Sequence, residues 1–226
     1  LVFAAFSGSH QDAIAKGMKW RKEKNCQHWT VPYLPIDPED VGRVYEADVI
    51  RINSQSGKGG IGYILENQFG IIMPPNMRET VGYLVKNVSD NAHRELMPSE
   101  VYNVFEKTFI NKQSPVSLKE AHYVQKDGIE ADVTIEYNGE IINEKAHGNG
   151  RLNAVSVCMK KMLGIEYVLH TYTEHAMEEK ATSKAVSYVG IKDNNGKNFW
   201  GVGIATDIID SSLKALVSAV NNMIED

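Results

Sequence analysis

The sequence has little cysteine and no long apolar segment, and each shortage excludes a class of protein. Only two cysteines, Cys26 and Cys158, occur in 226 residues, and no CxxC pair is present. This pattern argues against a disulfide scaffold and predicts a reduced, cytoplasmic setting. No apolar run approaches the roughly 20 residues that a membrane-spanning helix needs. The apolar run at residues 1–6 is too short for the core of a signal peptide, so we predict no membrane partner.

The sequence also lacks an excess of basic charge. It contains 24 Lys and Arg against 29 Asp and Glu, which gives a formal net charge of −5. Nucleic acids and anionic membranes bind basic patches, so this balance predicts no nucleic-acid partner. With 42% hydrophobic and 23% charged residues, the composition is that of an ordinary globular protein, long enough for one large domain or two small ones.

No motif in the sequence forms a catalytic or metal site by itself. HExxH and GxSxG motifs are absent, and the seven histidines show no metal-ligand spacing. The segment "SQSGKGG" (54–60) approaches a phosphate-binding loop, but Ile52 stands where the first glycine belongs and Gly59 replaces the required Ser or Thr. We expect a glycine-rich turn at this segment, and neither a metal nor a cofactor bound by this chain.

Residues 1–40 predict a short helix followed by a stiff connector. In "AFSGSHQDAI" (5–14), Ser9 and Asp12 have the spacing of a capping-box-like helix start, which leaves His10 unexplained. One face of the helix would be apolar: Ala13, Ile14, Gly17 and Met18. The connector "VPYLPIDPEDVG" (31–42) carries three prolines, each of which fixes φ and removes a hydrogen-bond donor.

Residues 41–111 predict a small α/β unit. The β-branched segments "YEADVIRIN" (45–53) and "IGYILENQFGIIM" (61–73) favour strands. Apolar residues at helical spacing predict helices near 77–88 and 99–109. The segment "NKQSPVS" (111–117) is typical of a linker, so a separate domain is expected after it.

The rest of the chain predicts one pattern twice. Strand-like segments at 118–126, 130–137 and 139–146 precede a helix that begins near Gly150 and ends at Gly164. Further strand-like segments, at 165–174, 184–192 and 198–205, precede a helix from Ser211. Two successive βββα units predict a pseudo-symmetric α+β domain.

Two segments of this repeat concentrate polar groups. "HGNGRLNA" (147–154) places Gly-Asn-Gly where a strand leads into a helix, and a helix N-terminus suits a carboxylate. A plain turn with Asn149 as the helix cap explains the same residues more simply. In "YTEHAM" (172–177), Glu174 and His175 are adjacent, so in a strand they point to opposite faces and form no acid–base pair.

Taken together, five segments resemble the C-terminal half of the 2-isopropylmalate synthase family. They are "AFSGSHQDAI", "VPYLPIDPEDVGRVYEADVIRINSQSGKGG", "HGNG", "YTEHAM" and "WGVGIATDIIDSSLKALVSAVN". The family fold implies an N-terminal TIM barrel, absent from this chain, then linker subdomain I (1–40), linker subdomain II (41–111) and a leucine-binding, dimerising regulatory domain (112–226). Because the chain starts with Leu1 and enters an apolar run at once, we expect it to be a fragment of a longer protein.

The resemblance also implies an activity. Family members condense acetyl-CoA with 3-methyl-2-oxobutanoate in leucine biosynthesis, using a divalent metal held by the barrel. The first subdomain lends a histidine and a tyrosine to the active site of the partner in a homodimer, and these match His10 and Tyr33. Proton transfer at neutral pH suits a histidine, and a tyrosine hydroxyl suits the orientation of a reacting group. Without its barrel, the fragment is expected to be inactive.

The effector site is likewise implied by the resemblance. Its expected residues are Gly148, Asn149, Gly150, Asn153, Tyr172, Ala176 and Ile208. The chain departs from the family pattern at two positions, with Arg151 where proline is common and Asn153 where aspartate is frequent. Leucine is the first expected effector and isoleucine the second. Two alternatives stay open, the regulatory part of a citramalate or homocitrate synthase and a stand-alone amino-acid-binding module.

Overall fold

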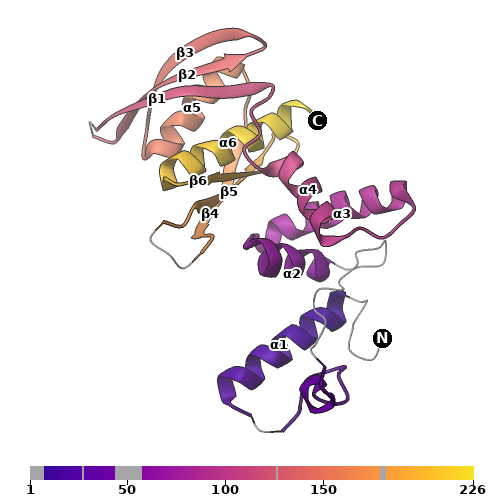
Figure 1. Cartoon of the computed structure of the whole chain (residues 1–226). Helices are drawn as coiled ribbons and strands as arrows, with labels where there is room; N and C mark the ends of the chain where they lie inside the picture. Colours follow the sequence, from indigo (N-terminus) through magenta and orange to yellow (C-terminus); the bar gives the residue numbers. More distant parts are fainter. Residues whose placement is uncertain (1–7, 27, 44–57, 126, 179–181) are drawn as a thin grey trace. The chain divides into compact units, whose positions relative to one another are not determined.

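The computed structural model of the chain describes residues 8–26, 28–43, 58–125, 127–178 and 182–226 (Figure 1). Contacts between residues divide the chain into two compact units, Leu1–Phe105 and Glu106–Asp226. Each unit contains its own cluster of buried apolar side chains. No helix among the described residues is long and apolar enough to cross a membrane.

Helix α1 (Gly8–Lys24) opens the described part of the first unit, and the connector folds back beside it. Ile14 is buried on the predicted apolar face, where it contacts Val31 and Leu34 of the connector. The short 3-10 helix η1 (Pro38–Val41) follows. The predicted helix and its apolar face are confirmed, and this face holds the connector against α1.

The start of α1 differs from the capping-box prediction. The helix already includes Gly8, so Ser9 lies within its first turn. An N-cap residue has a non-helical backbone. The prediction that Ser9 caps this helix is therefore wrong.

Three helices follow in residues 58–109: α2 (Lys58–Phe69), α3 (Pro75–Ala92) and α4 (Pro98–Phe109). The predicted helices near 77–88 and 99–109 are confirmed. The strand predicted at 61–73 is wrong, because Ile61, Ile64 and Leu65 are buried at the i, i+3, i+4 spacing of a helix. The strand predicted at 45–53 lies outside the described residues. Residues 58–105 contain no strand, so this subdomain is helical where the structure describes it.

The second unit repeats three strands and a helix. The first copy consists of β1 (Val116–Gln125), β2 (Ile129–Tyr137), β3 (Glu140–Gly148) and α5 (Arg151–Leu163). The second copy consists of β4 (Val168–Ala176), β5 (Ala185–Lys192), β6 (Asn198–Ala205) and α6 (Ile208–Ile224). Each set of strands forms an antiparallel sheet in chain order. The predicted βββα repeat and the α+β class are confirmed.

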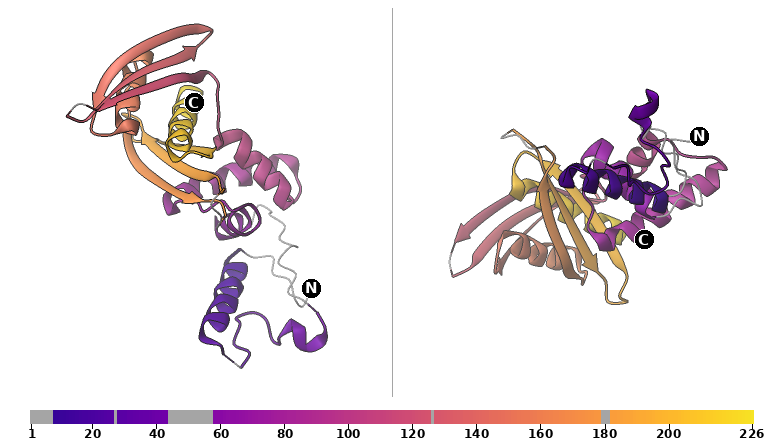
Figure 2. Two further views of the ribbon diagram at one scale, coloured as in Figure 1. Left: turned by 60° about the vertical axis from the view of Figure 1, so that its left-hand side comes forward. Right: turned by 90° about the horizontal axis from the view of Figure 1, so that it is seen from below.

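The two helices of this unit lie between its two sheets (Figures 1 and 2). Helix α5 packs on β2 and β3, α6 packs on β5 and β6, and the helices contact each other. The core joins both copies, because its buried residues come from β1, β2 and α5 as well as from β5 and α6. The second unit is therefore one domain and not two independent repeats.

Glycines allow α6 to approach β6 closely. A Cβ atom at Gly203 would lie 1.7 Å from the carbonyl oxygen of Ser211, and one at Gly201 would lie 2.1 Å from that of Ala215. Real Cβ atoms do not make such short contacts, so any side chain here would displace the helix. This packing fixes the first turn of α6 in place.

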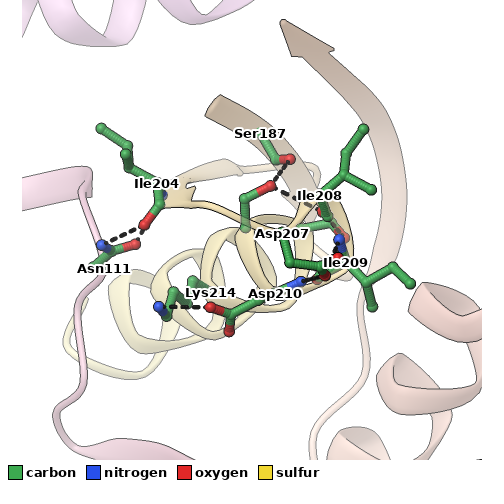
Figure 3. Close-up of polar contacts among 10 residues, drawn as sticks. Asn111, Ser187, Ile204, Asp207, Ile208, Ile209, Asp210 and Lys214 are labelled. Carbon is green, nitrogen blue, oxygen red and sulfur yellow. Dashed lines mark hydrogen bonds and ion pairs between the residues drawn. The ribbon is translucent and has the colours of Figure 1, made fainter. Parts of the chain in front are cut away.

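The segment predicted as a linker at 111–117 is bound to the second unit. The side chain of Asn111 accepts a hydrogen bond from the backbone N–H of Ile204 (2.9 Å) and donates one to its carbonyl oxygen (3.1 Å; Figure 3). The buried side chain of Asn221, on α6, accepts from the N–H of Val116 at 2.7 Å. These bonds make the segment part of the packed domain.

Candidate functional site

The structure brings His10 and Tyr33 together. Their ring centroids are 4.0 Å apart and their planes are inclined by 25°, which is a stacked arrangement. His10 lies in the first turn of α1, whereas Tyr33 lies on the connector and is 62% exposed. Both side chains therefore face solvent on one side of the first unit, where they can reach another molecule.

The backbone at Tyr33 has an unusual conformation. Its φ angle is 63°, in the left-handed region that residues with a side chain rarely adopt. Pro32 and Pro35 restrict the backbone on either side of it, and Leu34 is buried against α1. The connector therefore presents the Tyr33 ring outward while its neighbours are held in place.

A histidine stacked on a tyrosine supplies one proton-transfer group and one hydroxyl. It does not supply a metal centre. Within the described residues, no group of three His, Cys, Asp or Glu side chains is arranged to hold a metal ion. The chemistry that the pair itself offers is therefore proton transfer or the orientation of a bound group.

The second unit contains a cavity of about 520 Å³ where the starts of α5 and α6 meet β4. Its lining residues are Gly150, Arg151, Leu152, Asn153, Leu169, Tyr172, Ile209 and Ser212. Three predicted effector residues, Gly150, Asn153 and Tyr172, are in this set. Leu152, Leu169 and Ile209 provide apolar surface, and Arg151 provides a cation. The lining thus combines an apolar part with groups that attract an anion.

The N-terminus of α5 is open towards this cavity. Gly150 is its N-cap residue, in an extended conformation with φ −160°, and makes no side-chain cap. The first helix-type hydrogen bond runs from the N–H of Ala154 to the carbonyl oxygen of Gly150 at 2.9 Å. The N–H groups of residues 151–153 precede that bond, and such groups bind anions readily.

Gly148 and Asn149 are not among the cavity-lining residues, but both contact the first turn of α5. A Cβ atom at Gly148 would lie 2.5 Å from the backbone nitrogen of Ala154, so only glycine fits between β3 and α5. The N–H of Asn149 donates to Oδ1 of Asn153 at 3.2 Å. Asn149 therefore does not cap α5 with its side chain; instead Asn153 folds back and braces the turn.

Tyr172 and Ala176 occupy β4. The Tyr172 hydroxyl donates a hydrogen bond to the Glu174 carboxylate, and partial burial is the main cause that raises the pKa of Tyr172. Ala176 is the last residue of β4 and is not in the cavity lining. The aromatic side chain is thus the part of "YTEHAM" that contacts the cavity.

At the start of α6, Ile209 lines the cavity instead of the predicted Ile208. The two side chains point in different directions from the first turn (Figure 3), and Ile208 is 46% exposed. The carboxylate of Asp207 caps this helix by accepting from the N–H groups of Ile209 (2.8 Å) and Asp210 (2.9 Å). Unlike α5, α6 therefore has its first N–H groups occupied.

The cavity includes Leu169, which the sequence interpretation missed. In a regular strand, residues three apart point to opposite faces, so Leu169 would face away from Tyr172. The pairing of β4 with β5 shifts between Leu169 and Thr171, which marks a bulge. The extra residue turns Leu169 to the same side as Tyr172.

Two protein-family models match the chain. Residues 1–66 match the model described as "Alpha-isopropylmalate synthase, post-catalytic domain-like". Residues 95–224 match "LeuA allosteric (dimerisation) domain", which covers more than half of the chain. Together they cover the segments that contain His10, Tyr33 and the cavity.

Curated relatives match over nearly the whole chain. A 2-isopropylmalate synthase of Desulfitobacterium hafniense is 54% identical over 226 residues, which are 100% of this chain and 41% of that protein. The 2-isopropylmalate synthase of Helicobacter hepaticus is 48% identical over 99% of this chain and 42% of its own length. That of Clostridium acetobutylicum is 43% identical over 98% and 40%. The chain spans about two fifths of these relatives and matches their C-terminal part.

Proposed function

The chain belongs to the 2-isopropylmalate synthase family, and we propose that it is part of an enzyme that condenses acetyl-CoA with 3-methyl-2-oxobutanoate. It corresponds to the C-terminal part of the family's proteins and contains the LeuA allosteric (dimerisation) domain. In this proposal, the chain supplies two residues to catalysis and one site for feedback inhibition. The identity of 54% over the whole chain supports the assignment. The enzyme is proposed to act as a cytoplasmic homodimer in leucine biosynthesis.

His10 and Tyr33 are the proposed catalytic contribution, made to the active site of the partner subunit. The condensation removes a proton from the acetyl methyl group and creates an alkoxide. An imidazole exchanges protons at neutral pH, and a tyrosine hydroxyl stacked beside it can orient the imidazole or a water molecule. Their mutual stacking at 4.0 Å is the observation that carries this proposal.

The remaining chemistry is assigned to the barrel. A divalent metal, which polarises a carbonyl oxygen when bound, and the keto-acid ligands belong there in this proposal. The 226-residue chain alone should therefore release no CoA from acetyl-CoA and 3-methyl-2-oxobutanoate in the presence of a divalent metal. Turnover above background would contradict the assignment.

The catalytic proposal is tested in the full-length enzyme. His10→Ala and Tyr33→Phe should each lower kcat by roughly 10²- to 10⁴-fold, the usual contribution of a general acid–base group. Lys19→Ala changes an exposed residue of the same helix and is the matched control. Near-normal kcat in both variants would make the pair structural. Mixing His10→Ala subunits with subunits inactivated in the barrel should restore activity if the site is shared across the dimer.

The cavity is the proposed effector site, with leucine as its ligand. The leucine carboxylate would bind at the open N-terminus of α5, and its branched side chain would contact Leu152, Leu169 and Ile209. Isoleucine is the second candidate, because Arg151 and Asn153 replace residues common in the family. The combination of an uncapped helix start with a partly apolar cavity carries this proposal.

Calorimetric titration of the chain with leucine, isoleucine and valine tests the effector site. Gly150→Asp should abolish binding, because its carboxylate would occupy the place of the ligand carboxylate. A Cβ atom at Gly150 meets nothing within 4 Å, so the variant should fold. Gly150→Ala adds the same Cβ without charge and should still bind. Failure of the parent chain to bind any of the three amino acids at millimolar concentration would contradict the proposal.

A further inference from the structure

The side chain of Arg21, on α1, contacts both ends of the loop at residues 29–37, which presents Tyr33. The guanidinium carbon of Arg21 lies 4.8 Å from the centroid of the Trp29 ring. Its Nη1 atom lies 3.1 Å from Oδ2 of Asp37, in an ion pair whose side chains are 29% and 13% exposed. Trp29 precedes Tyr33 and Asp37 follows it, so a single guanidinium links the two ends of the loop to the helix that carries His10.

The side chain at each end of the loop in turn makes a hydrogen bond with a backbone group. The indole N–H of Trp29 donates to the carbonyl oxygen of Leu34 at 2.7 Å. The other carboxylate oxygen of Asp37 accepts from the N–H of Glu39 at 3.1 Å and caps η1. Arg21 is therefore linked through Trp29 to the backbone immediately after Tyr33, and through Asp37 to the backbone at the end of the loop.

These contacts bear on a residue whose conformation is uncommon. The left-handed conformation of Tyr33, with φ 63°, is one that residues with a side chain rarely adopt, and it persists only where the surroundings hold it. Relaxation of Tyr33 to an ordinary backbone conformation would swing its ring away from His10. The stacking thus depends on the groups that keep the loop closed.

The loop also lies unusually close to α1. A Cβ atom at Gly17 would lie 2.7 Å from Cδ of Pro32, the residue before Tyr33. A side chain at Gly17 would push the loop away from the helix. Contact at Gly17, near the middle of α1, and contact at Arg21, one turn further on, together set the separation between the helix and the loop.

We infer that Arg21 is a positioning residue, which holds Tyr33 in its left-handed conformation against His10 through Trp29 and Asp37. The catalytic part of this inference rests on the function proposed for His10 and Tyr33. Arginine suits the role because its planar group stacks on an aromatic ring and pairs with a carboxylate at the same time. Lysine keeps the charge but has no planar group that can stack on Trp29 while it pairs with Asp37, so it should substitute partially.

The geometry can be tested on the chain itself by NMR. The Tyr33 ring displaces the ring-proton resonances of His10, which are identified by their loss in His10→Gln. In Arg21→Gln, these resonances should move to the positions found in Tyr33→Ala, and Arg21→Lys should give intermediate positions. Lys22→Gln removes the same charge from an exposed neighbour and should leave them unchanged. Unchanged His10 resonances in folded Arg21→Gln would overturn the inference.

The consequence for catalysis is tested in the full-length enzyme. Arg21→Gln should lower kcat by about 10- to 100-fold, as expected for a misplaced catalytic group, with the KM values unchanged and partial recovery in Arg21→Lys. If His10→Ala is impaired but Arg21→Gln has a normal kcat, the positioning role is overturned. Normal kcat in His10→Ala would instead refute the proposed function, and the NMR result would still decide the geometry.

Discussion

The two βββα copies share one topology but differ at the start of their helices. The N-cap residue of α6 is Asp207, whose carboxylate accepts hydrogen bonds from the N–H groups of Ile209 and Asp210 (Figure 3). The N-cap residue of α5 is Gly150, which provides no such group. The same fold therefore has one helix start with a carboxylate cap and one without a side-chain cap, and the uncapped start is the proposed anion site.

The helices also differ in the contacts that hold them in the domain. Helix α6 lies directly on glycine positions of β6 and is tied to β5 by the hydrogen bond of Ser211 with Ser187 (2.7 Å). Helix α5 is tied by Cys158, whose thiol donates to the carbonyl oxygen of Glu144 (3.5 Å), and by Ser156, whose hydroxyl donates to Tyr167 (3.0 Å). The α6 contacts are sensitive to side-chain size, whereas those of α5 include groups that titrate at high pH.

The largest expected effect is steric and concerns α6. Gly203→Ala places a Cβ atom 1.7 Å from the carbonyl oxygen of Ser211, so the helix or the strand must move. Overpacking typically costs 1–3 kcal/mol, and contact with a backbone puts the expected loss near the upper end, about 3 kcal/mol. Urea unfolding of the chain measures this loss. Gly150→Ala, at the start of α5, should change the free energy of unfolding by less than about 0.5 kcal/mol.

The next effect is alkaline and concerns α5. Burial raises the pKa of Tyr167 from 10.0 to about 12, against a smaller opposite effect of its hydrogen bond with Ser156. The folded state therefore holds the phenol proton more tightly than the unfolded state. This contribution is complete below pH 10 and is lost as the pH rises towards 12.

Between pH 10 and 11, the free energy of unfolding should accordingly fall by about 1 kcal/mol more in the parent chain than in Tyr167→Phe. In Tyr167→Phe, the free energy should be lower at pH 8 but should decline less with pH. Tyr83→Phe, at a side chain that is 59% exposed, is the control and should keep the parent slope. Equal slopes in the parent and in Tyr167→Phe would remove this difference between the helices.

The sequence predicted the second unit well and the first unit partly. Long alternating and helical periods determine the order of elements in the two βββα copies, and none of these elements was misassigned. The segment at 61–73 failed, because its short β-branched run fits a strand and a buried helix equally. Only the burial of Ile61, Ile64 and Leu65 on one face decides for the helix.

The candidate sites were predictable only where local sequence determines geometry. The helix start near Gly150 was predicted from its glycines, but the interpretation of Asn149 as the helix cap was wrong. The contribution of Leu169 depends on a bulge that no periodicity reveals. The pairing of His10 with Tyr33 came from family resemblance, because a left-handed tyrosine is contrary to local preference and depends on tertiary contacts such as those of Arg21.

The smallest effects concern the caps themselves. Asp207→Ala removes the α6 cap and should lower the free energy of unfolding by about 1 kcal/mol. Gly150→Asp adds a cap to α5 and should raise it by only a few tenths of a kcal/mol, since glycine is itself a tolerated N-cap residue. Thermal unfolding without ligand measures both. Destabilisation by Gly150→Asp would show that the α5 start cannot accept a carboxylate.

Leucine should reverse the order of stability of the parent chain and Gly150→Asp. A ligand that binds only the folded state stabilises it by about 2.7 kcal/mol at 100 times its Kd, which exceeds the gain from one added cap. The parent chain should therefore become more stable than Gly150→Asp when leucine is present, although it is slightly less stable without it. The reversal requires the ligand carboxylate and the Asp side chain to compete for the same N–H groups. Stabilisation of both proteins by leucine to the same extent would place the effector away from the α5 N-terminus.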